Sequence, residues 1–234
     1  MNRISLPKNA LQRVDVGKAF AEYDLIRKDQ QLFVSTPATL AALDPSGGSC
    51  FFIGRRGAGK TAIVFEIQRK FQRTISLAPQ IFDLLELPLN HEEFRDTRQR
   101  PFKSLMHSLE RALVDEVIRQ CVLAKIFDFR DAPETIRRER NLIEDCDFDQ
   151  RVLNLTEEIF QAYSQDQDKL WLRQIKRSKQ LVHELKAYEG DGNFNYLILI
   201  DRLDESWDGS DSAIICLMAL MHATVRLTSS TECV

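Results

Sequence analysis

The chain has 234 residues, of which 44% are hydrophobic and 29% are charged, and its formal net charge is −3. This balance is typical of a soluble globular protein and excludes a fibrous or disordered chain. The small net charge provides no overall basic field for nucleic acid, and the apolar run at residues 196–200 is far shorter than the roughly 20 residues that span a bilayer. No apolar segment of the signal-peptide kind follows Met1, so we expect a cytoplasmic protein without a membrane partner.

The first part of the chain predicts helices around short apolar strands. Apolar residues recur at helical spacing over residues 10–30, and a short helix is predicted from Thr36 to Leu43 because Pro37 favours a helix start. The apolar run at 49–53 predicts a buried strand. The elements expected next are a glycine-rich loop, a helix over 61–70, a strand at 74–77 and an extended piece at 84–87.

The second part predicts a long helical region and a second apolar strand. An amphipathic helix begins at Pro101, because Leu105, Leu109, Leu113 and Val117 recur every four residues. The elements expected after it are charged and mostly helical residues 134–186, a turn at 190–193, a buried strand at 194–200, an apolar helix at 212–227 and a frayed tail at 228–234.

The glycine-rich loop matches the P-loop pattern G-x-x-x-x-G-K-S/T, with a strand predicted before it and a helix after it. Glycines allow the backbone to turn several N–H groups toward a phosphate, and the helix N-terminus adds its positive dipole. Lys60 would bind the β- and γ-phosphates, and the Thr61 hydroxyl would bind Mg²⁺. The alternative is an ordinary glycine-rich turn with a surface lysine.

The second apolar strand ends in acids, as a Walker B strand does. Asp201 follows the strand and would hold Mg²⁺ through water, while Asp204 or Glu205 would orient or deprotonate the attacking water. Arg202, which cannot accept a proton, occupies the position after Asp201 where the catalytic glutamate most often lies. The alternative is a core strand that runs into an acidic surface turn.

These motifs assign three groups of site residues. The catalytic residues are Lys60, Asp204 and Glu205, and the metal ligands are Thr61 and Asp201. The nucleotide-binding residues are Gly54, Arg55, Arg56, Gly57, Ala58, Gly59, Lys60, Thr61 and Ala62. Arg55 and Arg56 either add charge near the phosphates or remain solvated, because the loop backbone already binds the anion.

Other chemistry-bearing residues point to no second site. Five scattered cysteines without a C-x-x-C pair indicate reduced thiols, and the four histidines lack metal-ligand spacing. Basic clusters at 137–140 and 173–179 could follow a nucleic-acid backbone, but neighbouring acids favour ordinary solvated helix faces. Trp207 is either a packing residue or a cover for the site, and the last apolar helix is either core or a partner interface.

With both motifs in hand, the chain resembles the additional-strand P-loop ATPases, in particular the AAA+/STAND (ORC/Cdc6-like) branch of bacterial type. The segment CFFIGRRGAGKTAI resembles the first strand and Walker A motif of those proteins, and YLILIDRLDESW resembles their Walker B motif. The resemblance is strong over 49–70 and 194–207 and weak between them. It implies a three-layer α/β core with ATP and Mg²⁺ as cofactors, and nucleotide-driven oligomerisation in DNA transactions or antiviral defence.

On this basis we expect one discontinuous P-loop NTPase domain with a large helical insertion between Walker A and Walker B. Its parts are a helical lead-in at 1–48, the first part of the core at 49–100, the insertion at 101–190, and the Walker B strand with its following helix at 191–234. The sequence contains no candidate for the family's sensor strand, arginine finger or helical lid. We therefore expect an incomplete core whose site is completed by a homo-oligomer or by a partner protein.

Three functions follow from these expectations. The first is a Mg²⁺-dependent ATPase that couples ATP to assembly or conformational change, in bacterial antiviral defence or DNA maintenance. The second is a nucleotide-gated switch with negligible turnover that needs a partner, motivated by Arg202 beside Asp201. The third is a small-molecule P-loop kinase. The absence of the guanine-specifying N-K-x-D pattern favours ATP over GTP.

Overall fold

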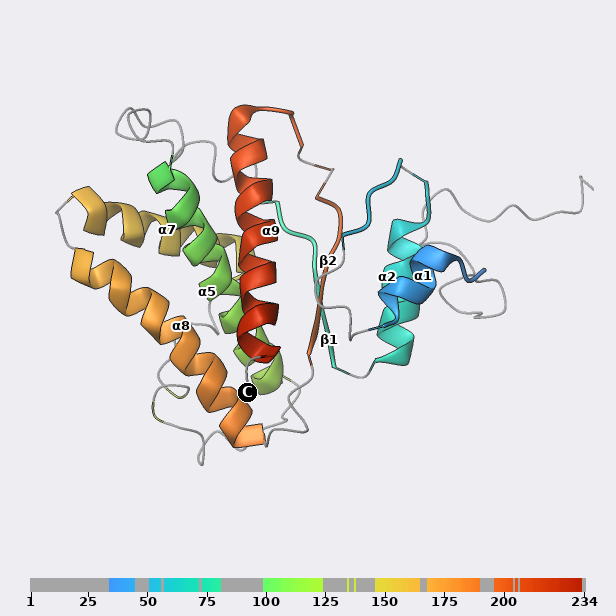
Figure 1. Cartoon of the computed structure of the whole chain (residues 1–234), viewed down its shortest axis with the longest axis horizontal. Coiled ribbons are helices and arrows are strands. Elements are labelled where there is room, and N and C mark those ends of the chain that lie inside the picture. Colours follow the sequence, from blue (N-terminus) through green and yellow to red (C-terminus); the bar gives the residue numbers. More distant parts are fainter. Residues whose placement is uncertain are drawn as a thin grey trace, which may run out of the picture. The chain divides into compact units, whose positions relative to one another are not determined.

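The computed structural model describes residues 34–44, 51–55, 57–71, 73–80, 99–123, 134, 137, 146–164, 168–189, 196–203, 205 and 207–232. The described residues up to Lys70 form one compact unit, unit 1, and those from Phe71 onward form a second, unit 2 (Figure 1). Each unit is taken by itself below. The helix predicted over 10–30 and the extended piece at 84–87 lie outside the described residues.

The described residues of unit 1 form two helices, α1 (Pro37–Ala42) and α2 (Lys60–Lys70), which contact each other. Helix α1 begins where the sequence predicts, because Thr36 and Thr39 form a reciprocal cap. Thr36 Oγ1 accepts the backbone N–H of Thr39 at 3.2 Å, and the backbone N–H of Thr36 donates to Thr39 Oγ1 at 3.3 Å. This cap satisfies backbone groups that a helix start otherwise leaves without partners.

The strand predicted at 49–53 differs from what the structure shows. Its described part, residues 51–53, lies in neither a helix nor a strand, and the Ile53 side chain is 98% exposed. A strand needs a neighbour to pair with, and the described residues of unit 1 include no other strand. The apolar run alone therefore does not make a strand here.

Unit 2 contains a two-stranded parallel sheet, formed by β1 (Thr74–Leu77) and β2 (Leu197–Ile200). Both strands agree with prediction in place, but β2 begins at Leu197 and not at 194, and its residues are half-buried where a buried strand is predicted. The strands pair from Thr74 opposite Leu197 to Leu77 opposite Ile200. The backbone N–H of Asp201 donates to the Leu77 carbonyl at 2.9 Å and extends the ladder by one residue. Because the strands are parallel, their carboxyl ends lie at one edge of the sheet, where α/β proteins place their ligands.

In the part of unit 2 that the structure describes, the long helices are α5 (Gln99–Leu123), α7 (Phe148–Ser164), α8 (Asp168–Glu189) and α9 (Asp211–Glu232). Helix α5 contacts the other three and β1, and Figure 1 shows it between α9 and the pair formed by α7 and α8. Leu105, Leu109 and Leu113 of α5 are fully buried, which confirms the apolar face predicted from their four-residue spacing. Helix α5 thus joins the core that includes β1.

Helix α9 is longer than the predicted 212–227, because it runs to Glu232 through residues expected to fray. Its start is capped by Ser210, whose Oγ accepts the backbone N–H of Ala213 at 3.1 Å. The turn before it is held by Asp208, whose Oδ1 accepts the Ser210 N–H at 2.8 Å. Hydrogen bonds from the Ser210 backbone and side chain lower the pKa of Asp208.

Candidate nucleotide-binding site

The predicted P-loop forms a tight turn that leads straight into α2. Gly57 and Gly59 have φ angles of 81° and 83°, in the left-handed region that glycine adopts without strain. The backbone N–H of Ala58 donates to the Arg55 carbonyl at 3.0 Å and closes the turn. Helix α2 begins at Lys60, so the first N–H groups of the helix follow the loop directly.

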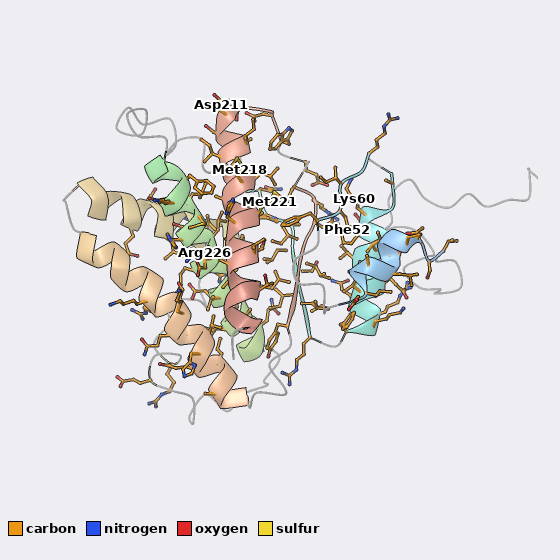
Figure 2. The ribbon with its side chains drawn as sticks, viewed as in Figure 1. Phe52, Lys60, Asp211, Met218, Met221 and Arg226 are labelled. Carbon is orange, nitrogen blue, oxygen red and sulfur yellow. The ribbon has the colours of Figure 1, made fainter. Side chains whose placement is uncertain are left out.

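The Lys60 side chain folds back over this loop. Its Nζ donates to the Gly54 carbonyl at 2.9 Å and lies 3.4 Å from the Arg55 carbonyl. Figure 2 shows Lys60 at the start of α2. A Cβ added at Gly54 would lie 3.2 Å from the Ala58 Cβ, so the turn brings these two residues close together. A cationic ammonium group beside exposed backbone at a helix start is the arrangement that attracts an anion.

The remaining nucleotide-binding residues lie where the motif requires them in the chain. Thr61 and Ala62 are half-buried in the first turn of α2, and Arg55 is exposed. Arg56 lies outside the described residues. Solvent exposure of Arg55 agrees with the alternative in which this arginine stays solvated.

The predicted acidic half of the site lies at the carboxyl edge of the sheet in unit 2. Asp201 is half-buried directly after β2, and the chain then turns sharply. Arg202 has a φ of 62°, and its carbonyl accepts the Glu205 backbone N–H at 3.1 Å. Arg202 Nε lies 3.9 Å from Glu205 Oε1. Asp204 lies outside the described residues.

The predicted site residues therefore form two local groups. Lys60, Thr61 and the glycines belong to unit 1, whereas Asp201 and Glu205 belong to unit 2. The described residues include no group of three or more His, Cys, Asp or Glu side chains that could hold a metal by themselves.

Asp149 of α7 also reaches the loop that follows β1, and the sequence did not single it out. Its Oδ2 accepts the backbone N–H of Gln80 at 3.0 Å. Burial raises the pKa of Asp149, although the Gln80 hydrogen bond opposes this effect. A single aspartate near the start of a helix has no sequence signature that would distinguish this contact from an exposed cap.

A network of buried charges between α5 and α7 was not predicted either. Glu116 and Arg151 form a buried ion pair that joins the two helices, and Arg111 Nε donates to Asp115 Oδ1 at 2.8 Å. Burial raises the pKa of Asp115, although the charges of Arg111, Arg151 and Arg177 favour its ionised form. Arg177 belongs to the second predicted basic cluster, and its charge thus favours the ionised form of the buried Asp115.

Helix α9 bears on the expectation of no membrane partner. Among the described helices, its segment Asp211–Thr228 is the one long and apolar enough to cross a membrane by length and composition. Core helices of soluble proteins can share both properties. Cys216, Ala219 and Leu220 of α9 are buried in the core that includes residues of α5, whereas Met218, which Figure 2 labels, is 48% exposed.

The comparisons with known proteins identify no relative: no protein-family model, no curated protein and no solved structure matches the chain. The functional argument therefore depends on the residues of this chain.

Proposed function

We propose that the protein binds Mg²⁺ and ATP at the P-loop and hydrolyses the ATP, coupling the reaction to conformational change or oligomerisation. Lys60 binds the β- and γ-phosphates, the loop backbone from Gly54 to Thr61 binds the phosphate oxygens, and Thr61 and Asp201 hold Mg²⁺. Asp204 or Glu205 orients the attacking water. The proposal includes a P-loop NTPase core, a cytoplasmic location, and a role in antiviral defence or DNA maintenance, as the family resemblance implies.

One observation carries the proposal: the Lys60 ammonium lies over a loop that contains two left-handed glycines and opens a helix. Its Nζ is 2.9 Å from the Gly54 carbonyl, while Gly57 and Gly59 have φ angles of 81° and 83°. An ordinary glycine-rich turn does not require a lysine at the first helical position whose ammonium group binds a carbonyl of the loop. The same features are what a phosphate-binding loop needs.

A nucleotide-gated switch with negligible turnover is the second candidate. It is favoured by Arg202, which follows Asp201 and lies 3.9 Å from Glu205. If Arg202 keeps Glu205 away from the attacking water, the protein binds ATP but hydrolyses it only when a partner supplies the group that orients the water. Binding and turnover must therefore be measured separately.

The deciding experiment measures binding of a fluorescent ATP analogue, with and without Mg²⁺, and phosphate release with and without DNA. Lys60→Ala is expected to weaken binding at least about tenfold, since it removes a charge-assisted contact to phosphate. Lys70→Ala is the matched control, because Lys70 ends the same helix and pairs with Glu66 at 3.7 Å. It should bind like the wild type.

The outcomes separate the candidates. Binding lost in the Lys60 variant together with Mg²⁺-dependent phosphate release supports the ATPase. Binding without release supports the switch, and stimulation by DNA supports a DNA-linked role. Equal binding by the Lys60 and Lys70 variants, or no binding by the wild type, contradicts the P-loop proposal.

A further inference from the structure

Helix α9 carries a row of exposed apolar side chains, although other residues of the same helix are buried in the core of unit 2. Ile214, Met218 and Val225 are 42%, 48% and 46% exposed, and Met221 is half-buried. Apolar residues exposed singly are normal on a protein surface, whereas a contiguous apolar patch marks an interaction surface. We call these four residues the α9 stripe.

The α9 stripe follows one line along the helix. Its members are spaced by four, three and four positions, so at 100° per residue they fall within an arc of about 60°. At a rise of 1.5 Å per residue the stripe is about 17 Å long. Cys216 and Ala223, which are fully buried in the core, lie about 180° away around the helix. The stripe therefore points away from the core that α9 shares with α5.

The spacing of the α9 stripe is the same when read from either end. If two copies of α9 lie antiparallel, Ile214 of one copy faces Val225 of the other, and Met218 faces Met221. Alternating spacings of three and four positions are also the pattern by which packed helices interlock their side chains. Each apolar residue of the stripe thus meets an apolar residue of the second copy, and the contact closes as a two-fold dimer.

The charges beside the α9 stripe favour the same orientation. Asp211 is exposed at the start of α9, and the partly exposed Arg226 lies toward its other end, as Figure 2 shows. At 100° per residue both lie on the same flank of the stripe, so antiparallel copies place Asp211 within about 3 Å of the level of the other copy's Arg226. Parallel copies would place like charges at the same level. Antiparallel packing also opposes the two helix dipoles.

A membrane surface suits the α9 stripe less well than a second copy does. Helices that lie on a membrane carry several Lys and Arg residues beside their apolar face. Helix α9 has a single such residue, Arg226, which already pairs with Glu110 of α5 at 3.2 Å. A membrane-spanning α9 would have to withdraw the buried Cys216 and Ala223 from the core.

We propose that the α9 stripe binds a second copy of the chain, with the two α9 helices packed antiparallel in a symmetric dimer. The stripe is about 17 Å long and a helix is about 10 Å wide, so it covers much less than the roughly 800 Å² per partner of a stable interface. The dimer is therefore weak, with a Kd in the micromolar range or above. It needs no nucleotide, so the inference goes beyond the proposed function and is tested separately.

Analytical ultracentrifugation of the full chain without nucleotide, over an about hundredfold range of concentration, measures the association. The wild type should shift from monomer to dimer. Met218→Glu should raise the Kd about tenfold or more, because it places a carboxylate among apolar side chains. Leu40→Glu is the matched control, because Leu40 of α1 is 62% exposed and lies outside the stripe. It should dimerise like the wild type, and urea unfolding tests whether Met218→Glu remains folded.

Cross-linking tests the orientation in a chain whose five natural cysteines have been replaced. Chains with Ile214→Cys and chains with Val225→Cys are oxidised separately and as a mixture. Antiparallel packing predicts a disulfide between the two variants in the mixture. Either variant alone should form few dimers, because its cysteines are about 16 Å apart along the helix axes, beyond the reach of a disulfide.

A wild type that stays monomeric at every concentration overturns the inference, whichever part of the chain covers the stripe. A dimer that Met218→Glu leaves intact overturns it as well, and so does cross-linking of Ile214→Cys chains to one another, which indicates parallel helices. Flotation of the monomer with phosphatidylglycerol–phosphatidylcholine vesicles, lost in Met218→Glu, assigns the stripe to a membrane instead. None of these results alters the expected binding of nucleotide by Lys60, which its own titration measures.

Discussion

Arg226 of α9 and Glu110 of α5 form an ion pair between the two helices, with Arg226 Nε 3.2 Å from Glu110 Oε2. The same carboxylate oxygen lies 3.4 Å from His107 Nδ1. Burial tends to raise the pKa of Glu110, but the His107 hydrogen bond and the Arg226 charge together outweigh it and lower the pKa below its ordinary value of 4.5. Ionised Glu110 therefore stabilises the contact between α5 and α9.

The first prediction concerns acid unfolding. A carboxyl whose folded pKa is lowered contributes stability above its unfolded pKa, here 4.5, and that stability is lost as the pH falls through the folded pKa. Arg226→Met removes part of the lowering, so the midpoint of acid unfolding should move to higher pH. At pH 7 the loss should be about 1 kcal/mol or less, because Arg226 is partly exposed.

Circular dichroism as a function of pH provides the measurement for Arg226→Met. Lys103→Met is the control, because it removes an exposed cation from α5, the helix that carries Glu110. Its midpoint should match the wild type. An identical midpoint for the Arg226 variant would show that the ion pair does not affect Glu110.

The second prediction concerns the buried ion pair between Arg151 of α7 and Glu116 of α5. Arg151 Nη1 also donates to the Cys146 carbonyl at 3.0 Å, just before α7 begins. Arg151→Met leaves a buried carboxylate with less compensation, so it should lower the free energy of unfolding by roughly 3–5 kcal/mol. Replacing both partners with Met and Leu should recover much of this loss, because well-packed apolar residues can substitute for a buried pair.

Urea denaturation measures these changes, with Arg119→Met as the matched control. Arg119 Nη1 also contacts Glu116, at 3.1 Å, but its side chain is 34% exposed. Its loss should cost under about 1 kcal/mol. Equal losses for the Arg119 and Arg151 variants would contradict the dominant role of the buried partner.

Much of unit 2 was predictable because it depends on local periodicity. The four-residue spacing of Leu105, Leu109 and Leu113 predicts a buried face on α5, and that face is fully buried. Strand β2 is predicted from an apolar run that ends at Ile200, and β1 from the short segment 74–77. The buried charges of α5 were not, because helical periodicity treats Glu116 as an outer position and cannot show that three other helices surround this one.

Some features of the candidate site can likewise be predicted from the local sequence, and others cannot. The positive φ angles of Gly57 and Gly59 follow from the motif, since glycine serves such positions. The left-handed Arg202 does not, because nothing in the residue type favours that conformation and the turn depends on the Glu205 hydrogen bond. The strand predicted at 49–53 requires a pairing partner that a local pattern cannot identify.

The third prediction tests the glycine conformations of the P-loop. A Cβ at Gly59 meets no atom within 4 Å, so Gly59→Ala is strained only by its φ of 83°. We expect nucleotide affinity to fall about tenfold or more, because the strain of about 1–2 kcal/mol turns the backbone N–H groups away from the phosphate. Titration with a fluorescent ATP analogue measures the change.

Gly209→Ala is the matched control for Gly59→Ala. Gly209 has a φ of 75°, and its nearest neighbour to an added Cβ is Trp207 Nε1 at 3.9 Å. This variant should lose a similar amount of stability without changing nucleotide affinity. If both variants bind nucleotide normally, the conformation of Gly59 has no part in binding.

The fourth prediction uses Cys216 to test how α9 packs. Cys216 of α9 is fully buried in the core that includes residues of α5, and burial raises its pKa to about 12. At pH 8 its thiolate fraction is then on the order of 10³-fold below that of an ordinary thiol with a pKa of about 8.5.

A variant that retains Cys216 as its single cysteine should react with a thiol reagent only as fast as the unit opens. A variant that retains only the half-buried Cys146 should react much faster, and both should react alike in urea above the unfolding midpoint. Rapid native labelling of Cys216 would show that α9 leaves α5, as a helix that enters a membrane must do.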